Sequence, residues 1–185
     1  MDDKIVNLDK KKIVGSGVTK FTYEIDDNYV CVCPKMINKE KIIVTEYDML
    51  IYLRSFKLPI VPEIELVKIK KCQSGCSMGI LQTNIKFGKL YKPMSGSPIE
   101  LPIHIISKIQ NMNYILCKHR IYITDLQLLY NDNEIYIIDP SNVYHVDRKY
   151  HIGHDKKLKH EDLYIKYLNQ MKSLDSTISY NLACS

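Results

Sequence analysis

The chain has 185 residues, of which 45% are hydrophobic and 25% are charged, a composition that excludes a disordered or collagen-like protein. Lys and Arg number 26 against 21 Asp and Glu, and the resulting net charge of +5 is too small for a dedicated nucleic-acid binder. No apolar run approaches ~20 residues and no signal-peptide pattern is present, so we expect a cytoplasmic protein without membrane contact.

The first half of the chain predicts two strands, a helix and two more strands. Asp26-Asp27-Asn28 and Gln73-Ser74-Gly75 are turn sequences between apolar runs. Between them, apolar residues recur with helical period from Ile43 to Ile51. We expect strands at 13–25, interrupted at Gly15 and Gly17, and at 29–33, 63–69 and 77–85, with a helix at 39–56.

The second half of the chain begins with a change in amino-acid composition. A hinge is expected at 86–92, followed by a connection rich in Pro and Ser, which includes Ser95-Gly96-Ser97-Pro98. A helix at 103–117, strands at 126–130 and 134–138, and a closing helix at 161–171 complete the prediction. The fold class is therefore α+β, with a strand-rich part at 1–88 and a reduced helical part at 89–185.

Three features of the strand-rich part fit a site that binds phosphate. Gly15 and Gly17 lack a Cβ atom, so their backbone amides can approach phosphate oxygens. Lys35 ends an apolar strand, where its ammonium group can reach the same oxygens. Glu46 lies in the following helix and can orient Lys35 through an ion pair. Taken singly, each feature has an ordinary structural explanation as a turn or as surface charge.

Two carboxylates occupy strand ends in the second half. Asp125 follows the apolar run 121–123, and Asp139 ends the apolar strand 135–138. Carboxylates in such places are costly unless they are paired or hold a cation. Because a hairpin joins the two segments, both side chains can converge on one Mg²⁺-phosphate cluster.

This order of residues resembles the protein-kinase family, over roughly residues 13–143. The resemblance implies a minimal bilobal fold, with an antiparallel sheet and one helix in the N-terminal lobe, a shortened helical C-terminal lobe, and ATP and Mg²⁺ bound in a cleft beneath the hinge. It further implies the following roles: Gly15 and Gly17 in the phosphate-covering loop, Lys35 as the strand lysine, Glu46 as its helix partner, Asp125 as the catalytic aspartate and Asp139 as the metal aspartate.

The chain departs from the family pattern at several positions. Tyr130 stands where the metal-binding Asn is expected, so Gln127 is its counterpart only if the catalytic loop is shortened. Asp139-Pro140-Ser141 replaces Asp-Phe-Gly, and no Ala-Pro-Glu follows. The resemblance is therefore to the compact kinases of bacterial effectors and large viruses, in keeping with the use of Ile, Lys and Asn, which suggests an AT-rich genome.

Two functions remain open. The first is a monomeric, minimal ATP-dependent kinase that phosphorylates a protein hydroxyl, with a protein partner that belongs to a host cell if the source is a virus or pathogen. The second is a catalytically inactive pseudokinase that acts as a binding scaffold or inhibits a cellular kinase. A nucleic-acid module using Lys10-Lys11-Lys12 and Lys156-Lys157 is disfavoured, because these basic runs are short.

The six cysteines predict a reduced, intracellular protein. Only Cys72-x3-Cys76 approaches the spacing of a zinc knuckle, and Cys31-x-Cys33 is too tight. The default interpretation is that free cysteines act as small buried hydrophobic residues. His151-x2-His154 also lacks neighbours that would complete a ligand set.

Overall fold

The computed structural model describes residues 4–94, 99–147, 150–153 and 158–184. The predicted connection at 95–98, His154 and Lys156-Lys157 lie outside these residues. In the described part, three α-helices accompany a six-stranded sheet and two three-stranded sheets, so the predicted α+β class is confirmed. Two compact units are present, unit 1 formed by Met1–Asp48 and Val61–Asn84, and unit 2 by Met49–Ile60 and Ile85–Ser185.

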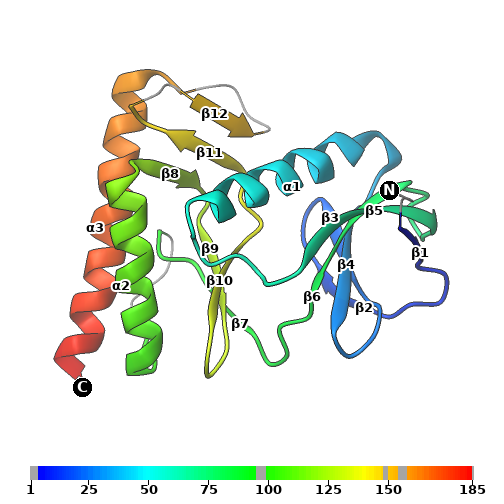
Figure 1. Cartoon of the computed structure of the whole chain (residues 1–185), viewed down its shortest axis with the longest axis horizontal. Helices are drawn as coiled ribbons and strands as arrows, with labels where there is room; N and C mark the ends of the chain where they lie inside the picture. Colours follow the sequence, from blue (N-terminus) through cyan, green and yellow to red (C-terminus); the bar gives the residue numbers. More distant parts are fainter. Residues whose placement is uncertain (1–3, 95–98, 148–149, 154–157, 185) are drawn as a thin grey trace. The chain divides into compact units, whose positions relative to one another are not determined.

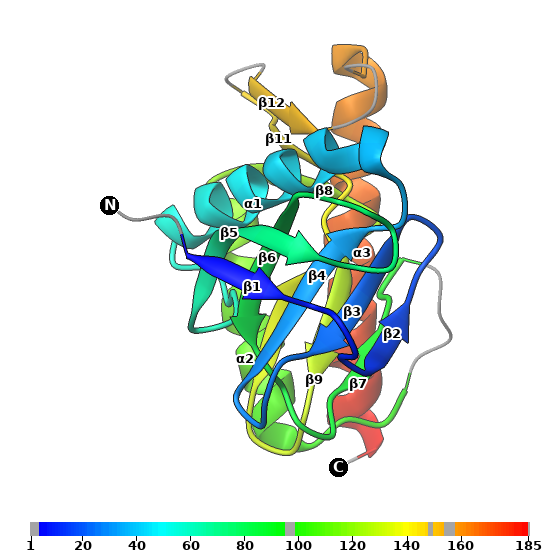
Figure 2. The same ribbon diagram turned by 90° about the vertical axis from the view of Figure 1, so that its right-hand side faces the viewer.

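Unit 1 contains the six-stranded sheet, whose strand order is β1-β5-β6-β4-β3-β2 (Figure 2). All neighbours are antiparallel except β1 and β5, which are parallel. The sheet is therefore mixed, whereas the sequence predicted an antiparallel one, because the three-residue β1 is too short to show a periodic pattern. The strands are β1 (Ile5–Asn7), β2 (Ile13–Ser16), β3 (Lys20–Glu24), β4 (Tyr29–Pro34), β5 (Ile64–Lys71) and β6 (Met78–Thr83).

The central strand β4 is buried on both faces, which explains its continuous apolar sequence. On one face, Val32 packs with Ile80 of β6 and Ile43 of helix α1 (Glu40–Ser55). On the other face, Cys31 and Cys33 join a cluster that includes Tyr23, Val67 and Leu81. A short 3₁₀ helix, η1 (Ile37–Lys39), connects β4 to α1. Side chains that alternate along β4 thus belong to two separate halves of the core.

Unit 2 contains helices α2 (Ile103–Lys118) and α3 (His160–Cys184), which lie side by side (Figure 1). The predicted hairpin is present as β9 and β10, and the predicted hinge contributes β7 to the same sheet, whose order is β10-β9-β7. A second sheet, β12-β11-β8, was not predicted. The strands are β7 (Lys89–Tyr91), β8 (Ile121–Thr124), β9 (Gln127–Tyr130), β10 (Ile135–Ile138), β11 (Asn142–His145) and β12 (Tyr150–Gly153).

The core of unit 2 depends on a regular apolar stripe along α2, formed by Ile105, Ile106, Ile109, Met112 and Leu116, all of them buried. Helix α3 is longer than the predicted 161–171 and its buried positions include polar residues. None of the helices in the described ranges is both long enough and apolar enough to cross a membrane.

Gln170 of α3 makes the most buried of these polar contacts. Its side chain is fully buried, and its Oε1 accepts a hydrogen bond of 2.9 Å from the amide of Ile123. Its Nε2 donates to the carbonyl oxygen of Ile121 at 3.3 Å. A glutamine therefore satisfies two backbone groups of β8 and attaches this strand to the helix.

We expect Gln170→Ala to lower the free energy of unfolding by at least about 2 kcal/mol, because two buried backbone groups of β8 lose their partners. Urea denaturation measures the change. Asn169→Ala, on the exposed side of the same helical turn, is the matched control and should stay within about 0.5 kcal/mol of the wild type. Equal stability of the two variants would contradict this role of Gln170.

Candidate functional site

The main feature of unit 1 is a buried ion pair between a strand and a helix. The Nζ of Lys20, at the start of β3, lies 2.6 Å from Oε2 of Glu46 in α1. The exposed fractions of the two side chains are only 12% and 6%. Removing two charges from water costs several kcal/mol each, and their attraction repays this only with good geometry. A pair in this position therefore calls for an explanation beyond general stability.

The register of the sheet explains why Lys20 reaches Glu46. Lys20 is directly opposite Pro34 in the β3–β4 pair. Pro34 lies two residues after Val32 on β4, so it projects from the same face of the sheet, the face that packs against α1. Residues opposite each other project from the same face of a sheet, so Lys20 projects toward the helix. Glu46 lies three residues after Ile43 and shares its buried face.

Lys35 does not form the predicted ion pair with Glu46, and this expectation is corrected. Its Nζ lies 4.8 Å from the centroid of the Phe21 ring, a cation–π contact. Lys35 lies two residues after Cys33 and projects from the same face of the sheet. The cross-strand neighbour of Cys33 is Phe21. A shift of one residue moves a side chain to the opposite face, so Lys35 follows the strand on the side away from Ile43 and Glu46.

The single strand predicted at 13–25 is wrong, because this segment forms two strands, β2 and β3, and Gly15 and Gly17 lie in the hairpin that they form. The amide of Gly17 donates to the carbonyl oxygen of Lys20 at 3.0 Å and closes the turn. A Cβ atom at Gly15 would lie 3.3 Å from the Thr22 side chain, whereas one at Gly17 would meet nothing within 4 Å. Gly17 and Lys20 therefore close the turn, with open space beside Gly17, while Gly15 precedes the turn in β2, opposite Thr22.

In unit 2, strand register brings Asp125 and Asp139 to the same end of a hairpin. Gln127 is opposite Ile138 in the β9–β10 pair, so Asp125 lies two residues before one strand and Asp139 one residue after the other. Strand β8, which ends just before Asp125, also pairs with β11, which begins three residues after Asp139. The two carboxylates predicted at strand ends thus lie at the same end of the β9–β10 hairpin.

The contacts of Asp125 and Gln127 are polar and partly exposed. Gln127 donates through Nε2 to Oδ2 of Asp125 at 2.8 Å, and Lys92 Nζ lies 3.6 Å from Oδ1. Asp125 and Asp139 both adopt left-handed backbone conformations, with φ of 54° and 50°. Carboxylate and amide oxygens are the ligands that Mg²⁺ prefers. This end of the hairpin therefore carries two carboxylates and one amide, which are groups of the kind that hard cations bind.

No family model matches the chain, and no curated protein sequence matches it either. The site must be judged from its residues.

Lys20 is the residue that sequence reasoning missed. A signal for it was present, because Glu46 falls on the apolar stripe of its helix at the spacing of Ile43 and Leu50. A carboxylate on a buried face requires a cation from the element that it packs against. The sheet supplies this cation.

We expect Lys20→Ala to lower the free energy of unfolding by about 3–5 kcal/mol, because Glu46 is left as a buried charge without its partner. Lys35→Ala, the matched strand lysine on the other face, should cost about 1 kcal/mol or less. The double variant Lys20→Met/Glu46→Leu should recover most of the loss, because apolar side chains can replace a buried pair. Urea denaturation of the wild type and the three variants measures their free energies of unfolding. Equal decreases for Lys20→Ala and Lys35→Ala would contradict the ion-pair role.

Proposed function

We propose that the chain is a minimal kinase-like protein that binds ATP and Mg²⁺ and transfers the γ-phosphoryl group to a protein hydroxyl. The observation that carries the proposal is the buried Lys20–Glu46 pair. An oriented, desolvated ammonium group suits phosphate binding better than surface lysines do, because its charge is fixed and weakly screened. In this proposal Lys20 takes the role that the sequence had suggested for Lys35.

The remaining roles follow the chemistry of each group. Asp139 would hold the metal ion, with Gln127 as a weaker second ligand. Asp125 would orient the acceptor hydroxyl and accept its proton, and the turn with Gly15 and Gly17 would contact the phosphates. These steps need positioning and charge stabilisation more than covalent chemistry, which a reduced fold can supply. The natural setting of the reaction would be the cytoplasm, with the protein acting as a monomer.

The contacts of Asp125 favour a second candidate, a pseudokinase scaffold. Both carboxylate oxygens already have partners, since Oδ2 accepts from Gln127 and Oδ1 lies near Lys92. A base engaged in this way is less available to an acceptor hydroxyl. The scaffold would bind a protein partner without transferring phosphate.

Nucleotide binding is tested by thermal melting with and without ATP and Mg²⁺, because a ligand that binds only the folded state raises the melting temperature. Lys20→Arg keeps a positive charge beside Glu46 but changes its shape, and it should reduce ATP affinity about tenfold, or about 1.4 kcal/mol. Lys35→Arg is the matched control and should bind as the wild type does. If both variants behave alike, Lys20 does not contact the phosphates.

Phosphoryl transfer is tested with radiolabelled ATP and the purified chain. Asp139→Asn should abolish transfer while preserving the fold, because Asn tolerates the left-handed backbone but lacks the charge that holds Mg²⁺. Asp125→Asn should remove most transfer but leave ATP binding, and Gln127→Ala should give a partial loss. Undiminished transfer by Asp139→Asn would overturn the mechanism. Nucleotide binding without transfer by the wild type would favour the scaffold.

A further inference from the structure

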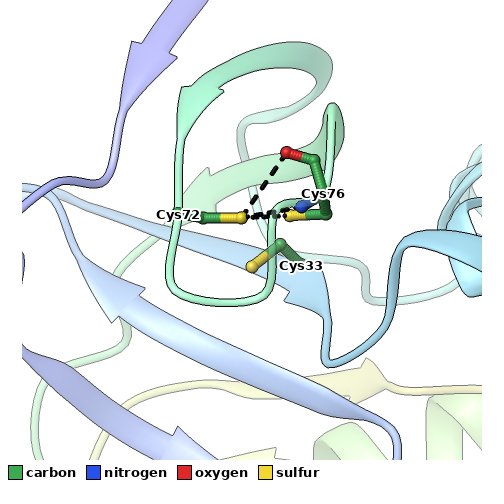
Figure 3. Close-up of side chains that lie close together, drawn as sticks. All are labelled: Cys33, Cys72 and Cys76. Atoms are coloured by element: carbon green, nitrogen blue, oxygen red, sulfur yellow. Dashed lines mark hydrogen bonds between the residues drawn. The ribbon is translucent and has the colours of Figure 1, made fainter.

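Three cysteine side chains converge in unit 1, on the face of the sheet opposite Lys20 and Glu46. Cys33 projects from β4, while Cys72 and Cys76 flank the turn that connects β5 to β6 (Figure 3). Their sulfur atoms all lie within 4.8 Å of one another, and those of Cys72 and Cys76 are 2.8 Å apart. Cys33 and Cys76 are buried, whereas Cys72 is half-buried. The fold thus adds a third thiol to a pair that the sequence showed only as Cys72-x3-Cys76.

The turn is built to hold the Cys72 sulfur in place. The amide of Cys76 donates to Cys72 Sγ at 3.0 Å, and Ser74 Oγ lies 3.3 Å from the same sulfur. Gly75 adopts φ of 70°, which lets the chain reverse within three residues. Ser74 Oγ also donates to the carbonyl oxygen of Pro34, next to Cys33. Hydrogen bonds of this kind orient the ligands of metal sites and tune their basicity.

We propose that Cys33, Cys72 and Cys76 form a binding site for a thiophilic metal ion, Zn²⁺ in the first place. A tetrahedral zinc ion with Zn–S bonds of about 2.3 Å holds its sulfurs about 3.8 Å apart. The observed spread of the three sulfurs needs only small movements to reach this arrangement. Iron–sulfur clusters use four cysteines, so three thiols favour a single ion. A Cys72–Cys76 disulfide would use two of the thiols and leave the third unexplained.

A fourth ligand can enter from solvent. Cys72 and Cys76 line a groove of about 640 Å³ together with Tyr23 and Gln73. The buried Tyr23 hydroxyl has no hydrogen-bond partner of normal geometry among the described residues, and burial is the main cause that raises its pKa. Lys10 and Lys71 line the same groove. Their charge favours a complex of three thiolates with Zn²⁺, whose net charge is −1.

Binding exchanges protons for the metal ion. Each thiol that coordinates loses its proton, and one Zn–S bond forms for each S–H bond that breaks. No oxidant or reductant takes part.

The test uses the full-length chain, reduced and freed of metal. Co²⁺ should produce a thiolate-to-metal charge-transfer band, and Zn²⁺ should displace it with a stoichiometry of one ion per chain by native mass spectrometry. Zn²⁺ should also raise the melting temperature, and EDTA should reverse the rise. These readouts need no ATP, so the metal site and the proposed kinase function can fail independently.

Cys72→Ser is the decisive variant, because Cys72 is half-buried and its replacement is compatible with folding. It should weaken Co²⁺ and Zn²⁺ binding at least about tenfold. Cys31→Ala, a buried cysteine of the same strand as Cys33, and Cys117→Ser, an exposed one in unit 2, are matched controls and should bind as the wild type does.

The proposal is overturned if no charge-transfer band and no zinc-dependent stabilisation occur, or if Cys72→Ser binds as tightly as the controls. It is also overturned if alkylation and peptide mapping of the chain, isolated without reductant, show a Cys72–Cys76 disulfide and the reduced chain binds no metal. In that case the turn would be a redox pair.

Discussion

The ion pair between Lys20 and Glu46 constrains the arrangement of the elements around it. Because both charges are largely removed from water, their distance must be held within a narrow range, or the desolvation cost is not offset. Three conditions follow. The β2–β3 turn must place Lys20 at the start of its strand, β3 must keep its register with β4, and Ile43 must seat α1 against the sheet. The apolar contacts of Ile43 with Val32 and Ile80 meet the last condition.

The same alternation that brings Lys20 to the helix separates two kinds of chemistry on one sheet. Val32 and the residues two positions away from it on β4 face α1. Cys33 and the residues two positions away from it face the thiol cluster. Lys35 shares the second face with Phe21. An ammonium group and a set of soft sulfur ligands are thus kept on opposite faces of the sheet. A substitution in one set should leave the other intact, since side chains on the two faces have few common neighbours.

Secondary-structure elements with long, regular apolar patterns could be predicted from the sequence. The contacts of single residues could not be predicted where they depend on the register between strands. The helix predicted at 103–117 and the strands predicted at 126–130 and 134–138 match α2 and the β9–β10 hairpin within a few residues. Strands β1, β7, β8, β11 and β12 were not predicted, because three or four residues carry no clear period of their own. Strands β9 and β10 are equally short, but they are consecutive apolar runs joined by a short turn sequence. Lys35 was preferred to Lys20 because it ended an apolar run, but face selection depends on cross-strand pairing, which a linear pattern does not contain. The grouping of Cys33 with Cys72 and Cys76 likewise requires the paired strands.

The left-handed backbone at Asp125 and Asp139 bears on why these residues are aspartates. Aspartate tolerates φ near 50° better than most residues, because its short polar side chain can hydrogen-bond locally. Conformation alone would accept Asn equally well and Gly at lower cost. The two aspartates share this conformation at the same end of one hairpin, and the charge of Asp125 is partly offset by Lys92, whose Nζ lies 3.6 Å from its Oδ1. In the proposed function the charge of Asp139 would hold a divalent cation, a role that Asn or Gly could not take at the same position although both fit its backbone conformation.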